Sequence, residues 1–257
     1  MRVEIINPEE VKNMIHNHGM FACVCYDTPD KYADRVGASC QDSGHMSGSR
    51  CEYIKFRIYD VDRGTCEQIL RHEIGVKVPK EDQDNYYFGD AIDINPSNIA
   101  KNMASFRYID KDGFTYTTPK NIEKCKDAKD IYDDIMKKIN VARRRIKHYL
   151  EGDGVESKKA TEDVNFVLPR ATNSSFTIGF TPEALIQFMH KRLCVRAQDE
   201  IRAVALEMKK KVLEILPEYK DKLVPHCQYL LWCPEGKMGC GAYPTKEELK
   251  EKLKYEE

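Results

Sequence analysis

The stretch CEYIKFRIYDVDRGTCEQILRHEIG, residues 51–75, joins two different periodicities and thereby decides the fold that we expect. In residues 51–61, aromatic and β-branched side chains alternate with charged ones. This period of two predicts a strand with one buried face. Gly64 and Thr65 then begin a helix, TCEQILRHEIG. The stretch therefore predicts a strand that leads directly into a helix.

Outward from this stretch, the same criteria predict further elements. A strand is expected at Ser174–Phe180, followed by a helix that Thr181 caps and that Pro182 opens. Pro8 opens the first helix of the chain, and Gly19 is expected to close it. Helices are also predicted at 30–41, 127–154 and 195–216. The fold class that these elements indicate is α/β (α+β), with an antiparallel sheet and a majority of helix.

The predicted helix at 127–154 is long and amphipathic. Its apolar residues keep helical spacing, and they are Ile131, Ile135, Ile139, Ala142 and Ile146. A basic face lies beside them and includes Arg143, Arg144 and Arg145. A charged face of this kind is typical of solvent exposure, so we expect these three arginines at the surface.

Length and charge limit the possible functions. The chain has 257 residues, enough for one large domain or two small ones with a substantial core. Lys and Arg number 41 and Asp and Glu 42, a balance that argues against a protein dedicated to duplex nucleic acid. No run approaches the roughly 20 apolar residues of a membrane span. The amino terminus lacks the pattern of a signal peptide, and we expect a cytoplasmic protein.

Ten cysteines are expected to be reduced thiols in such a protein. One cluster in the tail leaves an alternative open, because zinc prefers nitrogen and sulfur ligands. It contains His226, Cys227, Cys233 and Cys240. The cluster lacks paired C-x2-C spacings, so a turn of free thiols is favoured and no metal is predicted.

Four segments, in order along the chain, resemble the flavin-dependent thymidylate synthase (ThyX) family. Residues 25–56 are similar to its early Cys-Tyr, its Gly-His-x-Ser/Thr turn and the following strand. Residues 66–75, CEQILRHEIG, resemble the opening of its Gln-x-x-Arg-His-Arg signature. Residues 162–180 contain its Val-Leu-Pro segment, and 185–205 resemble its carboxyl-terminal helices. Four ordered matches carry more weight than any single motif.

The resemblance implies a ThyX-like flavin and nucleotide domain over 1–220 and a Cys-containing extension over 221–257. It implies methylation of C5 of dUMP with methylenetetrahydrofolate as one-carbon donor, and FAD as the source of the hydride. NADPH is the expected reductant of the flavin, and the expected assembly is a homotetramer. None of the cysteines has to act as a nucleophile in this chemistry.

The resemblance also implies roles for individual residues. Arg192 is expected to polarise the pyrimidine ring, as the catalytic residue and part of the substrate site. Gln68 is expected to contact the pyrimidine, and Glu81 and Gln83 fall where the family holds the substrate phosphate. The expected cofactor-binding residues are His45, Ser47, Arg71, His72 and Gln187.

This sequence also departs from the family pattern. Glu73 replaces the third signature residue, usually arginine, and Glu81 and Gln83 replace a serine and an arginine. Asn165 stands where an arginine is expected to bind the nucleotide. Thr181 and Glu183 replace an Asn-x-Arg pair near the flavin. A carboxylate where a phosphate should bind costs several kcal/mol on order-of-magnitude grounds.

These departures leave three hypotheses open. The first is a working thymidylate synthase with an altered phosphate site, and it is the one we favour. The second is the same chemistry on another pyrimidine nucleotide. The third is a non-catalytic member of the family that serves as a subunit or binding scaffold, because fold does not determine activity.

Overall fold

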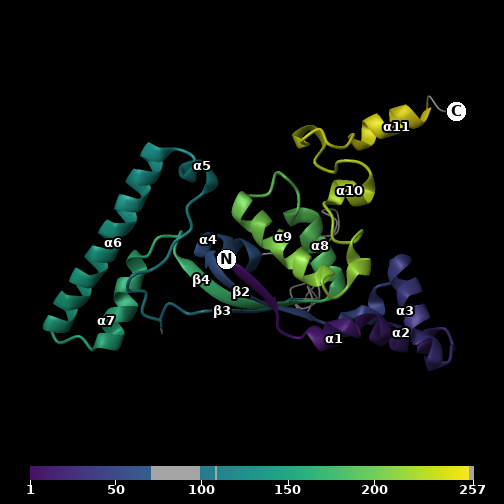
Figure 1. Cartoon of the computed structure of the whole chain (residues 1–257), viewed down its shortest axis with the longest axis horizontal. Coiled ribbons are helices and arrows are strands. Elements are labelled where there is room, and N and C mark those ends of the chain that lie inside the picture. The colour runs from purple at the N-terminus through teal and green to yellow at the C-terminus, as the bar shows by residue number, and fades with distance from the viewer. Residues whose placement is uncertain (71–98, 108, 255–257) are drawn as a thin grey trace, which may run out of the picture. The chain divides into compact units, whose positions relative to one another are not determined.

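The computed structural model describes residues 1–70, 99–107 and 109–254. They form two compact units. Among the described residues, the first unit contains 1–2, 57–70, 102–107 and 109–177, and the second contains 3–56, 99–101 and 178–254. Figure 1 shows the helices and strands of both units. The mixed α/β class predicted from the sequence is confirmed.

The strands form a four-stranded antiparallel sheet in the order β1-β2-β4-β3. Their bounds are β1 Arg2–Ile5, β2 Ile54–Asp62, β3 Ile99–Met103 and β4 Asn173–Phe180. The alternation predicted for β2 is confirmed, because Ile54, Phe56 and Ile58 are buried. Asp60 has a φ of 57°, and beyond it two successive residues are buried. The alternation therefore ends at Asp60.

The change from strand to helix after β2 depends on Asp62. Helix α4, Arg63–Leu70, follows β2 without a loop. The buried Asp62 carboxylate accepts a hydrogen bond from the Thr65 backbone N–H at 2.8 Å, which is the bond that an N-cap residue makes. The helix begins at Arg63, slightly before the predicted Gly64. The Arg63 and Gly64 N–H groups donate to the backbone oxygens of Thr172 and Arg170, and Asp62 satisfies the N–H of Thr65.

The prediction that Gly19 ends the first helix is wrong. Two helices occupy this region, α1 Pro8–Lys12 and α2 Met14–Cys25, and Gly19 lies inside α2. A Cβ atom at Gly19 would lie 1.7 Å from the Ala33 carbonyl oxygen, and one at Gly37 would lie 2.0 Å from the Ile15 carbonyl oxygen. Both glycines therefore permit a close crossing of α2 and α3 (Ala33–Asp42).

Short 3-10 segments extend this helical region at both ends of α3. They are η1 Asp30–Tyr32, which begins the helix predicted at 30–41, and η2 Ser47–Cys51. Gly44, with a φ of 74°, makes the turn after α3, close to where the sequence predicted its end. The turn places residues 45–47 directly after α3 and before β2.

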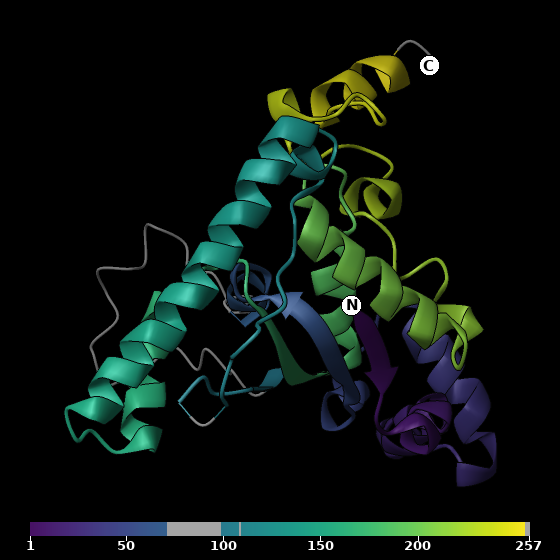
Figure 2. The ribbon, with the colours of Figure 1, turned by 60° about the vertical axis from the view of Figure 1, so that its left-hand side comes forward.

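Helices α5 (Lys120–Glu123), α6 (Lys126–Gly152) and α7 (Ser157–Val164) belong to the first unit. Helix α7 packs along α6, as Figure 2 shows. The expected surface position of Arg143 is wrong, since Arg143 is only 2% exposed. Its guanidinium donates to the backbone oxygens of Lys111 and Val164, which explains how a charge can be buried here. Arg144 and Arg145 are exposed, as expected.

The second unit has its core around α8 and α9. Helix α8, Pro182–Arg192, begins as predicted, and the Thr181 hydroxyl accepts from the Ala184 N–H. The aromatic rings of Phe56, Phe180 and Phe188 pack together and are fully buried. Helix α9 spans Asp199–Leu213, a narrower range than the predicted 195–216. One face of α9 is apolar and buried, and it consists of Ile201, Val204, Ala205, Met208 and Val212.

The tail contains two more helices, α10 His226–Leu230 and α11 Lys246–Lys254. Helix α10 packs against α8. The remaining 3-10 segments are η5 Asn165–Val167, η6 Pro217–Tyr219 and η7 Gly236–Met238. None of the helices formed by the described residues is long and apolar enough to cross a membrane. The predicted boundary between 220 and 221 stays a prediction.

Candidate functional site

A cavity of about 410 Å³ lies in the second unit beside α8, and we call it the α8 cavity. Helix α8 supplies Gln187, His190 and Lys191 to its wall. Such a volume is within the usual range of small-molecule sites. The other lining residues come from the end of α3, the following turn, the start of α8 and the tail, and they are Gln41, Asp42, Gly44, Met46, Glu183, Ile186, Asp221, Lys222, His226 and Tyr229.

The turn after α3 brings the predicted His45 and Ser47 to this part of the unit. Gly44 and Met46 line the α8 cavity together with Gln187. His45 lines a neighbouring cavity of about 330 Å³, where its Nδ1 and the Tyr26 hydroxyl share a hydrogen bond of 3.2 Å. Ser47 begins η2, which packs against α8. Of the three predicted cofactor-binding residues, His45 therefore lies in the turn, Ser47 in η2 and Gln187 in α8.

A stack of rings forms one wall of the α8 cavity. The His190 and His226 rings are parallel within 11°, with centroids 5.0 Å apart, and the Tyr229 ring lies 4.8 Å from His190. Burial, and secondarily His226, lowers the pKa of His190 to about 4, and burial lowers the pKa of His226. The buried Nε2 of His190 has no hydrogen-bond partner among the described residues. At neutral pH this wall is therefore aromatic and uncharged.

Glu183, where the resemblance implies an arginine, has a cation close to it in the structure. The Glu183 carboxylate accepts from the Arg50 Nε at 3.3 Å. Arg50 comes from η2, the segment that Ser47 begins. The Arg50 guanidinium therefore lies close to position 183. It comes from η2 and not from α8, and the Glu183 carboxylate neutralises its charge.

Arg192, the predicted catalytic residue, is the last residue of α8. Its side chain is half-buried, and its Nε has no hydrogen-bond partner within the described part of the chain. Burial lowers the pKa of the guanidinium, but an arginine remains charged at neutral pH. A buried charged donor is suited to an oxygen atom of a bound ligand. Arg192 follows Lys191, yet it does not itself line the α8 cavity.

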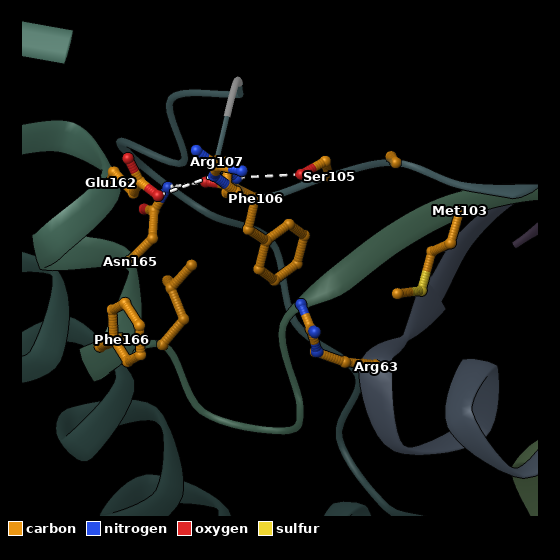
Figure 3. Close-up of a pocket in the computed structure, with 10 residues that line it drawn as sticks. Arg63, Met103, Ser105, Phe106, Arg107, Glu162, Asn165 and Phe166 are labelled. Atoms are coloured by element: carbon orange, nitrogen blue, oxygen red, sulfur yellow. Dashed lines mark hydrogen bonds and ion pairs between the residues drawn. The ribbon is translucent and has the colours of Figure 1, made fainter. Parts of the chain in front are cut away.

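A second cavity, of about 590 Å³, lies in the first unit, and we call it the Asn165 cavity. In Figure 3 the Phe106 ring points toward Arg63, whose guanidinium carbon is 4.7 Å from the ring centroid. Arg107 donates to Glu162 at 2.7 Å at the same cavity. The remaining lining residues are Met103, Ala104, Ser105, Asn165, Phe166 and Leu168.

Asn165 has its whole amide engaged within the unit. Its Nδ2 donates to the backbone oxygens of Phe106 and Ile109, and its Oδ1 accepts from the buried Arg143. The network connects α6, η5 and the segment before α5. Asn165 therefore holds the fold together at the position where the resemblance implied a nucleotide-binding arginine.

The remaining predicted residues lie elsewhere. Gln68 is half-buried in α4 of the first unit. The signature residues Arg71 and His72, and Glu81 and Gln83 of the expected phosphate site, lie outside the described residues. Their predicted roles stay predictions.

The tail cysteines do not form a metal site in the part of the chain that the structure describes. No group of three or more His, Cys, Asp or Glu side chains there is arranged to hold an ion. Cys233 is buried, Cys227 is half-buried and Cys240 is exposed, and all three are free thiols. His226 packs on His190 instead.

Several lining residues were not predicted from the sequence. His190 lies three residues after Gln187, so helical spacing alone could have indicated it. His226 and Tyr229 carry no such signal, because only tertiary packing brings α10 to α8. Arg63 and Phe106 are likewise brought together by the fold.

Comparisons with known proteins found a matching family model and several similar proteins. A family model described as thymidylate synthase complementing protein matches residues 16–218. A flavin-dependent thymidylate synthase of Nitratidesulfovibrio vulgaris is 33% identical over 213 residues, covering 82% of this chain and 77% of that protein. Proteins with the same name from Clostridium tetani and Thermococcus onnurineus are each 28% identical, over 77% and 81% of this chain and 73% and 76% of their own lengths.

Proposed function

Because this chain belongs to the flavin-dependent thymidylate synthase family, we propose that it methylates C5 of dUMP. In this proposal methylenetetrahydrofolate is the carbon donor, FAD is the flavin and NADPH reduces it. The assembly is a homotetramer that acts in the cytoplasm. The observation that carries the proposal is that Gln187 of α8, the helix that ends at Arg192, lines one cavity together with Gly44 and Met46, the residues on either side of His45.

The α8 cavity has the chemical character that part of a flavin nucleotide requires. Lys191 lines it and can attract the pyrophosphate, whereas Lys222 is ion-paired with Asp42 at 2.9 Å. The flat, uncharged faces of the His190 stack suit a planar ring, and the free Nε2 of His190 can share a hydrogen bond with it. A bound flavin supplies the hydride that completes the methyl group. Gln187, His190 and Lys191 are the residues that would hold it.

Arg192 is assigned to the pyrimidine. Its guanidinium would donate a hydrogen bond to a carbonyl oxygen of the ring. Negative charge builds on such an oxygen when C5 becomes a nucleophile, and a charged donor stabilises that charge. Because Arg192 Nε is already buried, little solvent has to be displaced when the ring binds.

The cysteine closest in sequence to Gln68 is unsuited to nucleophilic attack. Cys66 is fully buried in α4, and burial raises the pKa of its thiol to about 12. It therefore stays protonated at neutral pH, whereas the thiolate is the nucleophilic form. This supports a reaction in which the pyrimidine forms no covalent bond to Cys66.

Asn165 favours a second candidate, the same chemistry on another pyrimidine nucleotide. Its amide is engaged by Arg143 and two backbone oxygens, so it offers no free donor to a phosphate. A substrate that uses a different phosphate contact than dUMP would be compatible with this network.

The test is a visible absorption spectrum of the purified protein before and after adding FAD and then dUMP. We expect flavin bands that shift with dUMP. Flavin bands without any response to dUMP, but with a response to another pyrimidine nucleotide, would favour the second candidate. A colourless protein that does not take up FAD would contradict both.

Arg192→Ala tests the residue assignment within the same experiment. We expect it to keep the flavin bands and to lower kcat/KM for dUMP by roughly 100-fold, the usual effect of losing one such donor. Arg196→Ala is the matched control, because Arg196 is an exposed arginine just beyond the same helix. Turnover of dUMP by Arg192→Ala at the wild-type rate would exclude the assigned role.

A further inference from the structure

His18 is a buried histidine of α2 that takes no part in the site described above. It is 1% exposed, and its Nδ1 has no hydrogen-bond partner among the described residues. A buried polar atom without a partner costs free energy, which an apolar side chain at the same place would avoid. We therefore expect the other ring nitrogen of His18 to make a contact that an apolar side chain could not make.

The other ring nitrogen contacts the turn after α3, which consists of residues 44–46 and which we call the 44–46 turn. The His45 backbone carbonyl accepts a hydrogen bond from the His18 ring. Burial lowers the pKa of His18 more than this hydrogen bond raises it, so the ring is neutral at pH 7. A neutral ring carries one proton, and because Nδ1 has no partner, we place this proton on Nε2.

Gly48, in η2, leaves room for the His18 ring. A Cβ atom at Gly48 would lie 2.6 Å from the Cδ2 atom of His18 and 3.2 Å from its Nε2 atom. A distance of 2.6 Å is too short for two carbon atoms, so either the ring or the backbone of η2 would have to move. The glycine at this position therefore allows α2 to donate to the 44–46 turn.

Other hydrogen bonds made by the backbone of the 44–46 turn are local. The Met46 N–H donates to the Gly44 carbonyl at 3.0 Å, and the buried Ser49 donates its hydroxyl to the Met46 carbonyl at 2.7 Å. These bonds set the shape of the turn, but their partners belong to the same short segment. The hydrogen bond from His18 comes from another helix, so it fixes the position of the turn relative to α2.

The 44–46 turn forms part of the wall of the α8 cavity through Gly44 and Met46, and part of the neighbouring cavity through His45. We propose that His18 is a positioning residue for the ligand of the α8 cavity, because its hydrogen bond to His45 keeps this part of the wall in place. The identity of the ligand as FAD rests on the proposed function. The position of the wall does not, and it can be measured without a ligand.

The first test measures the position of the wall in the ligand-free full chain by NMR spectroscopy. The methyl resonance of Met46, assigned with Met46→Leu, reports on the 44–46 turn. In His18→Leu the donor is lost while an apolar side chain fills most of the space, and we expect the Met46 resonance to shift or broaden. His18→Gln keeps an N–H donor, so its Met46 resonance should stay close to that of the wild type.

Met14→Ala is the matched control. Met14 is 1% exposed and lies one turn before His18 in α2, so its truncation removes buried contacts from the same helix but keeps the donor to His45. We expect Met14→Ala to lower the free energy of unfolding at least as much as His18→Leu, and to leave the Met46 resonance in place. Urea denaturation measures the free energy, so the comparison separates positioning from a general loss of stability.

The second test measures FAD affinity by flavin fluorescence. We expect His18→Leu to bind FAD roughly tenfold more weakly, because a small displacement of a binding group has effects of this size or larger. His18→Gln and Met14→Ala should keep the wild-type affinity.

Gly48→Ala tests the same contact from its other side. On its own it should weaken FAD binding roughly tenfold, because the new Cβ atom displaces the His18 ring. In a chain that already carries His18→Ala there is no ring to displace, so Gly48→Ala should weaken binding little further. Such a loss of additivity is the signature of two residues that act through one contact.

An unchanged Met46 resonance in His18→Leu would overturn the proposal. So would a His18→Gln variant that loses FAD as strongly as His18→Leu, or a Gly48→Ala variant that binds FAD like the wild type. A wild-type chain that takes up no FAD would contradict the proposed function alone, because the Met46 measurement needs no ligand. Circular dichroism confirms that each variant is folded, and His18→Gln and Gly48→Ala decide the outcome if His18→Leu is not.

Discussion

The α8 cavity and the Asn165 cavity each contain a position where the resemblance implies an arginine and this chain has another residue. At the α8 cavity this residue is Glu183, and Arg50 from η2 forms an ion pair with Glu183. At the Asn165 cavity, Arg143 from α6 is also close, but it is buried and binds the Asn165 amide. The same kind of replacement thus has two different structural consequences.

The two arginines, Arg50 and Arg143, differ in their exposure to solvent. The Arg50 side chain is 60% exposed and can rearrange around a ligand, so the local charge at the α8 cavity is adjustable. Arg143 is 2% exposed and donates to three acceptors, so its charge is committed to the fold. We therefore expect changes at the Asn165 cavity to act on stability and changes at the α8 cavity to act on binding.

The largest effect is expected for Arg143→Met, which removes the donor to Lys111, Val164 and Asn165. Two buried acceptors and one part-buried acceptor would lose their partner, and the free energy of unfolding should fall by roughly 4 kcal/mol. Urea denaturation measures it. The control is Arg144→Met, which removes an exposed ion pair with Asp112 and should cost less than about 1 kcal/mol. Equal losses in the two variants would contradict the distinction.

Asn165→Arg introduces the residue that the resemblance implies at this position, and we still expect it to lower stability. The new guanidinium would lie against the buried Arg143, and the backbone oxygens of Phe106 and Ile109 would lose their donor. The free energy of unfolding should fall by about 3 kcal/mol. Affinity for dUMP should not improve. A variant that gains dUMP affinity without losing stability would show that the position is still available to a nucleotide.

Local signals in the sequence predicted much of this architecture. Thr181 and Pro182 fixed the start of α8, and the alternation through Ile54, Phe56 and Ile58 fixed β2, because capping and strand period depend on near neighbours. The family resemblance assigned both Gln187 and the turn at His45 to the flavin, which stays a prediction. These features needed no knowledge of distant contacts.

Other features could not be predicted, because they depend on residues far apart in the chain. Glycine commonly ends a helix, so the sequence alone indicated a helix end at Gly19. Only the close approach of Ala33 shows that Gly19 permits helix packing instead. Arg143 resembles its neighbours Arg144 and Arg145 in sequence, and only η5 and its surroundings explain its burial. His226 lies beyond the family match, yet it lines the same cavity as Gln187.

The pKa of His190 predicts a dependence of stability on pH. The unfolded ring titrates near 6.5 and the folded ring at about 4, so between these values the unfolded state binds more protons. The contribution of His190 to the free energy of unfolding is fully present above pH 6.5 and is lost as the pH falls toward 4. Between pH 7 and pH 5 the loss should be about 2 kcal/mol. Urea denaturation at both pH values measures it.

His190→Phe tests whether this residue is the cause. Phenylalanine keeps a ring against His226 but cannot bind a proton, so the loss between pH 7 and pH 5 should become smaller. His226, whose pKa is also lowered, should retain its own contribution. An identical pH dependence in the variant would assign the effect to another group.

The smallest effect is expected at Glu183, where the comparison of the two cavities is most sensitive. Glu183→Gln leaves the Arg50 charge uncompensated at the α8 cavity, so FAD affinity should rise. The expected rise is about threefold, because an ion pair this exposed contributes less than about 1 kcal/mol. Arg50→Gln should lower the affinity to a similar extent, because it leaves the carboxylate alone. Flavin fluorescence titration measures both, with Glu214→Gln as the control, because Glu214 is also ion-paired but lies outside the cavity. Suppose that Glu183→Gln instead lowered the unfolding free energy as strongly as Arg143→Met. The ion pair of Arg50 with Glu183 would then stabilise the fold as the contacts of Arg143 do, and Arg50 could not rearrange around a ligand.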